Sequence, residues 1–291
     1  MTEADRCWGI YPDRCWGIYR ESAHSPGRVD DDRGILESVG LAMQARGFTV
    51  ELLAAEQADA VIDRAGANIF AMCECGEMLD RLQDATRLGS MVINEPAAIK
   101  NTYRHRTIEL FAKHKVPTPT SRVIATDTQA LFPVDGVWIK RYDYHATKAE
   151  DVLYAASPAG WREGLSRFAA NGIPYVVVQD HVPGDLVKFY GVGTADADAA
   201  TGWFQWFYHR DKGMSGYAFN IDQLRAVARH AARALGVEIF GGDAIIRPDG
   251  QPVIIDLNAW PSFAKYRDQA ASAIADHLSG RFRRRLRVIS Q

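Results

Sequence analysis

Short apolar runs alternate with longer segments of helical period along the first third of the chain. Strands are predicted at 15–19, 48–53, 68–72 and 91–94. Helices are predicted at 32–45, where Gly47 stops the pattern, and at 77–88. Because strands and helices alternate with short loops between them, we expect a parallel sheet that ends near Pro96.

The remaining two thirds mix both periods in a less regular order. A helix dense in cations is expected over 97–114, and it must stop before Pro117 and Pro119. Further strands are expected at 134–144, 175–179 and 186–192. Further helices are expected at 159–170, 222–235 and 269–278.

Two β-branched runs flank Asp249-Gly250, and they predict a hairpin. If these two residues form the turn, Asp243 lies directly opposite Asp256, and Asn258 shares their face of the sheet. Pro248 leaves open a type I turn with a one-residue bulge.

The two facing aspartates are candidate metal ligands. Opposed carboxylates lie about 5 Å apart and repel each other. A bound cation would turn this repulsion into attraction, and oxygen ligands select a hard ion such as Mg²⁺, with Mn²⁺ as a substitute. The alternative is an ordinary hairpin with two surface aspartates.

Composition excludes several other classes of protein. The 291 residues are 47% hydrophobic and 24% charged with a net charge of −2, typical of a globular chain with two or three subdomains and no general attraction to nucleic acid or membranes. The four cysteines are too few for a disulfide scaffold, and the N-terminus lacks a signal-peptide pattern. We therefore expect a cytoplasmic protein. Residues 5–11 repeat as 13–19, and we expect the second copy to carry the first strand.

Residues 90–278 resemble the ATP-grasp superfamily. The most specific likeness is Asp256-Leu257-Asn258-Ala259-Trp260-Pro261 after Phe240-Gly241-Gly242-Asp243. The resemblance implies an α/β (α+β) ATP-grasp fold with a Rossmann-like pre-ATP-grasp domain (1–96, with 1–12 as an extension), a connecting helix (97–128), a lid subdomain (129–185), a C-terminal antiparallel subdomain (186–280) and a basic tail (281–291).

The same resemblance implies ATP clamped between two β-rich subdomains. Lys140 would reach the phosphates, with Arg104 or Arg106 approaching from the helix. Mg²⁺ would be held by Asp243, Asp256 and Asn258. The expected hinge, whose backbone would bind adenine, is Gln179-Asp180-His181-Val182. Lys188 would contact the transferred phosphoryl group or the acceptor. Arg210 lies in the segment that closes over the triphosphate in such enzymes, where it would form an anion pocket with Lys265 and Arg267. For each cation alone, the alternative is a solvated surface residue.

Within the superfamily, the chain is similar to the inositol trisphosphate 5/6-kinases. The likeness rests on 140–147, on 186–193 and on 239–246 with Asp-x-Asn at 256–258. It implies acceptor contacts from Arg20, His145, Ser262 and Lys265. The sequence departs from the kinases at Glu150, at Ser262 and at Cys73-Glu74-Cys75, all acceptor-pocket positions.

We therefore expect γ-phosphoryl transfer from Mg·ATP to a small anionic, inositol-phosphate-like acceptor, by a monomer or homodimer. The alternative is an ATP-dependent carboxylate–amine ligase that proceeds through an acyl phosphate, because it uses the same constellation. A third hypothesis is a binder without enzymatic activity, with the arginines of 281–287 contacting nucleic acid or a membrane; we expect that segment to be a solvated end instead.

Overall fold

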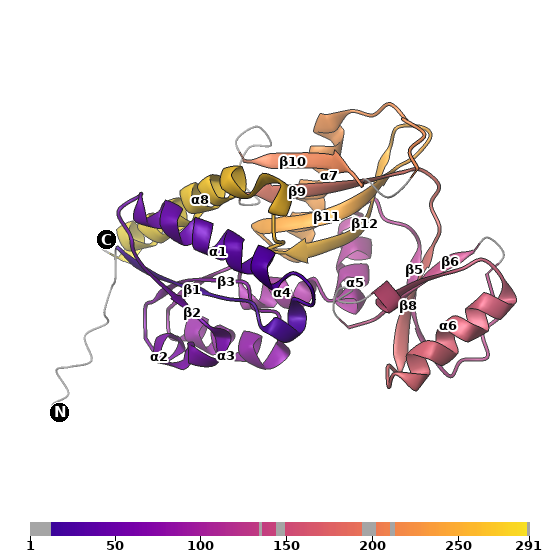
Figure 1. Ribbon diagram of the computed structural model, residues 1–291, viewed down its shortest axis with the longest axis horizontal. Coiled ribbons are helices and arrows are strands. Elements are labelled where there is room, and N and C mark those ends of the chain that lie inside the picture. The colour runs from indigo at the N-terminus through magenta and orange to yellow at the C-terminus, as the bar shows by residue number, and fades with distance from the viewer. Residues whose placement is uncertain (1–12, 134–135, 144–148, 194–201, 210–212, 290–291) are drawn as a thin grey trace.

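The computed structural model describes residues 13–133, 136–143, 149–193, 202–209 and 213–289. In this part of the chain the strands form three four-stranded sheets (Figure 1). The first copy of the duplicated heptapeptide lies outside the described residues, whereas the second copy supplies strand β1 (Arg14–Ile18).

The N-terminal sheet is parallel, as expected, with the order β2-β1-β3-β4. Its other strands are β2 (Thr49–Leu53), β3 (Asn68–Ala71) and β4 (Met91–Ile93). On one face Trp16 and Ile69 pack with α2 (Asp59–Ile62) and α3 (Gly76–Arg87). On the other face Cys15 and Phe70 pack with α1 (Val29–Gln44) and α8 (Arg267–Ile289). Because both faces are covered, these strands read as continuous apolar runs.

The expected helix over 97–114 is two helices, α4 (Pro96–Asn101) and α5 (Arg104–His114). Tyr103 between them has extended backbone. The break has a tertiary cause, because the first backbone amides of α5, those of Arg104 and His105, donate to the carbonyls of Asp143 and Tyr142 instead of continuing a helix.

The lid sheet has the antiparallel order β5-β8-β6-β7 and is covered by α6 (Pro158–Ala170). Its strands are β5 (Ser121–Ala125), β6 (Val137–Arg141), β7 (Val152–Ala155) and β8 (Tyr175–Asp180). The sequence did not predict β5 or β7, which are short and only partly buried. The lid sheet and the N-terminal sheet lie at opposite ends of the molecule (Figure 1).

The central sheet has the order β10-β9-β11-β12. Its strands are β9 (Asp185–Val192), β10 (Phe204–Tyr208), β11 (Ile239–Ile246) and β12 (Pro252–Ala259). Val187 and Phe189 of β9 are buried together with residues of α7 (Ile221–Leu235). Lys188 and Tyr190, which alternate with them along the strand, face the other side. This alternation gives the sheet one apolar face and one polar face.

The hairpin joins β11 to β12 through three residues rather than two. The amide of Gly250 donates to Arg247 O, and Gly250 has φ +79°, so the expected two-residue turn is wrong and the type I turn is correct. Next to this longer turn, the strands pair Ala244 with Ile254. The register then shifts by one residue between Asp243 and Ala244, so that Asp243 pairs with Asp256 as expected. Ile255 is the extra residue of this bulge.

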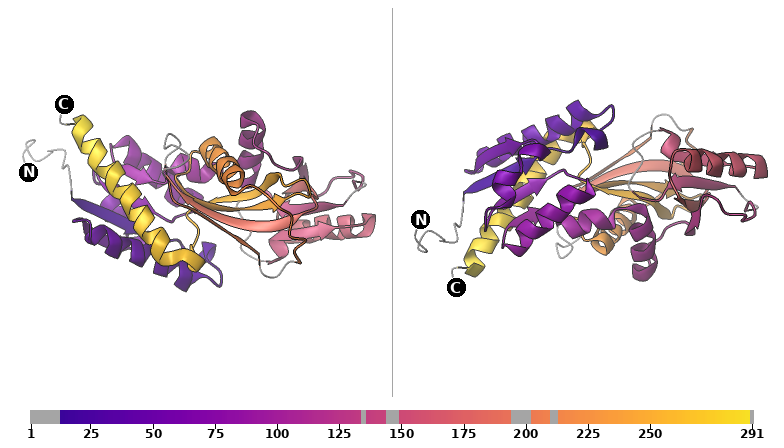
Figure 2. Two further views of the ribbon diagram at one scale, coloured as in Figure 1. Left: turned by 90° about the horizontal axis from the view of Figure 1, so that it is seen from above. Right: turned by 90° about the horizontal axis from the view of Figure 1, so that it is seen from below.

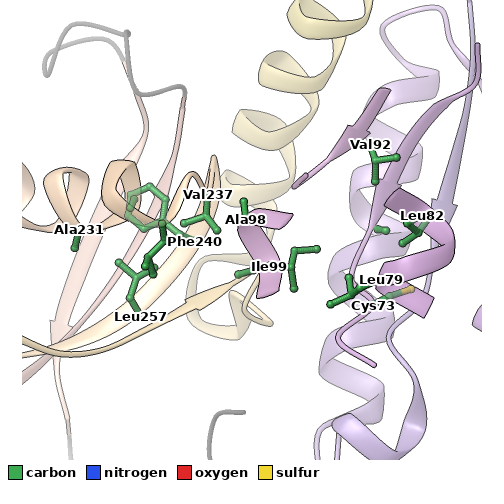
Figure 3. Packing of buried hydrophobic residues seen from close by; sticks show 14 of the residues in the cluster. Cys73, Leu79, Leu82, Val92, Ala98, Ile99, Ala231, Val237, Phe240 and Leu257 are labelled. Atoms are coloured by element: carbon green, nitrogen blue, oxygen red, sulfur yellow. The ribbon is translucent and has the colours of Figure 1, made fainter. Parts of the chain in front are cut away.

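A continuous core joins the N-terminal unit to the central sheet. Ala98 and Ile99 of α4 lie between Leu79 of α3 and Phe240 of β11 (Figure 3). At the start of β11, buried Asn94 accepts from the amides of Glu238 and Ile239 and donates to Ile239 O. The β11–β12 hairpin is therefore fixed against the N-terminal unit.

The final helix is much longer than expected, and the segment after Gly280 is not a solvated tail. α8 continues to Ile289 and lies beside α1 (Figure 2). Phe282 is fully buried and Arg285 donates to the carbonyls of Ala67 and Gly89, which the sequence could not reveal. In the described part of the chain, no helix is long and apolar enough to cross a membrane.

Candidate active site

The polar face of the central sheet carries a row of charged side chains. Lys188 on β9 pairs with Asp243 on β11, which pairs with Asp256 on β12. Lys188 Nζ lies 2.9 Å from Asp243 Oδ1, and Arg104 Nη2 lies 3.6 Å from Asp256 Oδ2. Each aspartate thus faces the other and has a cation on its outer side. The predicted convergence of Asp243 and Asp256 is confirmed.

The donor set at this row fits a hard divalent cation. Asn258 is on the same face as Asp256, and its Oδ1 is buried without a hydrogen-bond partner among the described residues. This buried oxygen has no hydrogen-bond donor and is on the same face as two opposed carboxylates, so the site has more hydrogen-bond acceptors than donors. In the described residues, no three His, Cys, Asp or Glu side chains cluster for a metal, so this oxygen-only trio remains the candidate.

Glycine at 242 allows the close approach of β11 and β12. A Cβ at this position would lie 2.4 Å from Asp256 O and 2.7 Å from the Phe189 ring. Any side chain there would push β11 away from β12, and the facing carboxylates would separate with it.

Lys140 is one of two buried cations of the site, together with Arg104. Its Nζ donates to Gln179 Oε1 at 2.8 Å and to Ile255 O at 3.2 Å. The second contact uses the carbonyl of the bulge residue. The pKa of Lys140 is lowered to about 8, mainly by burial; the carboxylate of Asp256 opposes the shift, nearby Arg104 adds to it, and Asp243 opposes it. Both hydrogen-bond partners of the Lys140 ammonium are neutral oxygens, so the ammonium can bind an anionic ligand in this buried position.

A cavity of about 260 Å³ opens beside Lys140, and we call it the α5 cavity. It lies among α5, the lid sheet and β12. Its lining includes Arg104, Phe111, Thr120, Lys140, Gln179, Ile255 and Asp256. Arg106 does not line it and is exposed on α5, which gives the expected ATP contact from this arginine no support. The structure thus brings Arg104, Lys140 and Asp256 to one cavity.

The expected hinge divides between two hollows. Gln179 lines the α5 cavity, and its amide is shared between Lys140 and Ser121. Asp180, His181 and Val182 line a neighbouring hollow of about 600 Å³, at the turn of the metal hairpin. The two hollows share Thr118, Pro119 and Thr120. The backbone contact to adenine expected here stays a prediction.

Among the expected acceptor residues, Arg20 is already engaged by protein groups. Its guanidinium is 2.6 Å from Glu74 Oε1 and 3.4 Å from Asp32 Oδ2, and it donates to Trp260 O at 2.5 Å. With 7% of its side chain exposed, it does not offer a free cation to a phosphate. The expected role of Arg20 as a phosphate contact is therefore not supported.

Lys265 and Ser262 lie on the segment after β12. The Lys265 ammonium is 4.4 Å from the centroid of the Phe207 ring, which pairs with Lys188 on the neighbouring strand, and Ser262 is buried. His145 and Arg210, the other two predicted residues, lie outside the described part of the chain.

Solved structures of low sequence identity share this architecture over nearly their whole length. They include D-cycloserine synthetase DcsG (TM-score 0.64, 17% identity, covering 92% of this chain and 99% of that chain) and the D-alanine-D-alanine ligase of Coxiella burnetii (0.67, 8%, 95% and 98%). A RimK domain ATP-grasp protein from Sphaerobacter thermophilus matches similarly (0.64, 16%, 91% and 99%). The chain has the ATP-grasp fold. No protein-family model and no curated protein matches the sequence.

The predicted fold class is confirmed by these structures. The finer likeness to inositol trisphosphate 5/6-kinases gains no support from them, because they are ligases, a synthetase and a RimK domain protein. Sequence reasoning also missed Asn94 and the structural use of Arg20. Neither has a local signal, because their partners lie 145 and 240 positions further along the chain.

Proposed function

We propose that this chain is an ATP- and Mg²⁺-dependent carboxylate–amine ligase. Support for the nucleotide half comes from Lys140 and Arg104, which border one cavity together with Asp256. Phosphoryl transfer requires mainly positioning and neutralisation of charge, and two cations beside an oxygen-only metal site supply both. Asp243, Asp256 and Asn258 would hold the Mg²⁺, which would neutralise charge on the phosphates.

The electrostatics of the opposite end of the hairpin favour a ligase over an inositol-phosphate kinase. Arg20 is surrounded by Asp32 and Glu74, and Glu21 adds a third carboxylate that accepts from the amides of Glu74 and Cys75. Even a protonated His24, 3.9 Å from Glu21, would leave this cluster one negative charge in excess. A polyphosphate would be repelled here, whereas an amine would be attracted. This observation carries our choice.

The fold comparisons support the same choice. The neighbours include D-alanine-D-alanine ligases and a D-Ala:D-Ser ligase from Enterococcus faecalis, whose names describe joining of amino acids. Identity of 8–12% to these structures extends only to the fold, so the reaction is our proposal for this chain.

The proposed reaction has two steps. A carboxylate oxygen of the first substrate attacks the γ-phosphorus. The bond between the γ-phosphorus and the bridging oxygen of the β-phosphate breaks, so ADP is released and the first substrate becomes an acyl phosphate. The amine of the second substrate then attacks the acyl carbon, loses a proton, and expels inorganic phosphate to give an amide. Lys140 and Arg104 would neutralise the nucleotide phosphates, and Lys188 would neutralise the transferred group.

The decisive experiment measures ADP and free phosphate with a panel of amino acids, dipeptides, other small carboxylates, amines and inositol phosphates. A ligase releases both products only when a carboxylate is present, and hydroxylamine traps the acyl phosphate as a hydroxamate. Stable transfer of labelled phosphate to a hydroxyl, with no need for an amine, would overturn the proposal in favour of a kinase.

Asp256→Asn tests the metal site within the same assay. Loss of one charge from a divalent-ion site should abolish turnover and weaken Mn²⁺ binding in the presence of ADP, with the fold intact by circular dichroism. Asp249→Asn is the matched control, because Asp249 lies in the hairpin turn and pairs with Arg247 away from the row. Equal activity of both variants would refute a catalytic metal at Asp256.

A further inference from the structure

Arg20 joins four segments that are far apart in the sequence. It lies just after β1, and its contacts reach Asp32 on α1, Glu74 after β3 and the carbonyl of Trp260 after β12. Its Nη1 and Nη2 donate to Glu74 and Trp260 O, and its Nε lies 3.4 Å from Asp32 Oδ2 as an ion pair without a hydrogen bond. A lysine cannot reproduce this arrangement, because an ammonium offers one compact charge instead of a planar fork.

The segment that Arg20 holds at its carbonyl begins two residues after Asn258. Trp260 has φ +39° and Phe263 has φ +51°, left-handed conformations that residues with a Cβ adopt at a cost. The Trp260 ring stacks on Phe70 of the N-terminal sheet, with ring centroids 6.1 Å apart and planes 18° apart. A strained turn persists only where its surroundings determine it. Here Arg20 and Phe70 of the N-terminal unit hold Trp260, while Tyr190 of β9 and Trp203 pack on Phe263.

The loop after β3 is held in the same way. Glu21, next to Arg20, accepts from the amides of Glu74 and Cys75 at 3.0 and 3.3 Å. Tyr103, at the break between α4 and α5, donates to Glu74 O at 2.7 Å. Arg20 and Glu21 thus bind the two loops of the N-terminal sheet to each other and to the turn after β12.

We call the contacts of Arg20 and Glu21 with the loop after β3 and the turn after β12 the junction. Its position relative to the proposed nucleotide site indicates a role in the reaction. β12 runs from the lid end, where Ile255 contacts Lys140, to the N-terminal end, where Trp260 contacts Arg20. The α5 cavity lies on the lid side of Asp256. With the nucleotide in the α5 cavity, a substrate that attacks the terminal phosphate would approach from the side away from ADP, toward the end of β12 near the N-terminal unit, where Arg20 contacts Trp260.

We propose that Arg20 is a positioning residue that sets the acceptor side of the site by holding the strained turn at 260–263 against the loops after β1 and β3. This inference rests on the proposed function for its direction of substrate approach. Arg20 itself touches no substrate. Loss of the Arg20 side chain should make the turn at 260–263 and the loops after β1 and β3 more mobile, while Asp243, Asp256 and Asn258 stay in place through strand pairing.

The test compares Arg20→Lys with the matched control Arg46→Lys. Arg46 also spans separate elements with its guanidinium, since it pairs with Asp276 and donates to Ala42 O and Ser272 O, all on α1 and α8 away from the site. Three readouts are measured for each variant: amide hydrogen exchange of the peptide covering 259–266, the Kd of Mg·ADP by calorimetry, and the KM of each substrate.

For Arg20→Lys we expect exchange in 259–266 to quicken and the acceptor KM to rise by about tenfold or more, with the Kd of Mg·ADP and the KM of ATP changed by less than about twofold. Arg46→Lys should change none of these three readouts, even where its unfolding midpoint falls by a similar amount.

Exchange that is unchanged in Arg20→Lys, or that quickens equally in both variants, overturns the inference. So does a parallel rise in the KM of ATP. The exchange and Mg·ADP measurements need no acceptor, so they decide the role of Arg20 even if no amine and carboxylate pair supports turnover and the proposed function fails.

Discussion

Lys188 Nζ lies 2.9 Å from Oδ1 of Asp243, one of the two carboxylates that face each other across the β11–β12 hairpin. The ammonium therefore occupies the outer side of a proposed metal ligand. A divalent ion at Asp243 would compete with this cation, and Lys188 would be released toward the phosphoryl group.

We expect Lys188→Met to separate metal binding from turnover. Removal of the competing cation should strengthen Mn²⁺ binding to the nucleotide-free protein, because Asp243 then lacks a positive partner. Turnover should fall by about tenfold or more, because the transferred phosphoryl group loses a cation. Electron paramagnetic resonance titration of Mn²⁺ gives the first quantity, and Lys113→Met, on the exposed side of α5, is the control. Weaker Mn²⁺ binding with unchanged turnover would contradict both roles.

The pKa of Lys140 predicts a pH dependence of nucleotide binding. Burial lowers this pKa to about 8 in the folded protein, below its ordinary value, so the free protein loses the ammonium as pH rises through about 8. Affinity for Mg·ADP should therefore fall between about pH 7 and about pH 9, and calorimetry at several pH values checks this.

Two variants isolate the contribution of Lys140. Lys140→Arg carries a charge that does not titrate in this range, so its affinity should be flat with pH. Lys140→Ala should weaken binding at all pH values by at least about tenfold, or about 1.4 kcal/mol. The same pH slope in wild type and Lys140→Arg would show that another group titrates.

The buried carboxylate of Asp185 predicts a stability effect outside the charged row. It is 1% exposed and accepts from the amides of Ser215, Gly216 and Tyr217, which fixes the segment before α7. Asp185→Asn places an amide donor among three donors and should lower the free energy of unfolding by about 1–3 kcal/mol. Urea denaturation measures the change. Asp180→Asn, at a half-exposed carboxylate, should leave stability nearly unchanged.

Phe282 predicts that the C-terminal segment stabilises the fold. It is fully buried, and its ring lies 6.2 Å from that of Phe48 in an edge-on arrangement. Phe282→Ala should lower the free energy of unfolding by about 3–5 kcal/mol. Arg284→Ala, two residues further along α8 on its exposed side, should change it by less than about 0.5 kcal/mol. Equal midpoints for the two variants in thermal melts would support the solvated tail that the sequence suggested.

The strongest sequence predictions concern residues whose partners are close in the chain. Asp243 and Asp256 are joined by one hairpin, so periodicity and turn chemistry sufficed to place them opposite each other. The turn itself was one residue longer than the simplest prediction, and the bulge at Ile255 compensated for it. Of the four parallel strands, β1, β3 and β4 were found because burial on both faces leaves a mostly apolar run, whereas the edge strand β2 is only partly buried.

The errors arose where distant segments decide the outcome. The break at Tyr103 exists because α5 starts on the carbonyls of Tyr142 and Asp143, just after strand β6. The strand β10 carries aromatic residues on both faces and lacks the alternation that marks a half-buried strand. The solvated tail was predicted from its arginines alone, although Phe282 belongs to the core of the N-terminal unit.

The sequence by itself determined the parallel N-terminal sheet and the pairing of Asp243 with Asp256 across one hairpin, because these depend on local periods and on one short turn. Lys140 was expected beside this pair only through the resemblance to the ATP-grasp superfamily. Tertiary structure alone decided which cations are available to a ligand. Arg104 and Lys140 line a cavity, whereas Arg20 is held by Asp32, Glu74 and Trp260 O. The physical reason is that a charge is free or compensated according to its neighbours in space, and those neighbours come from segments that local patterns do not connect.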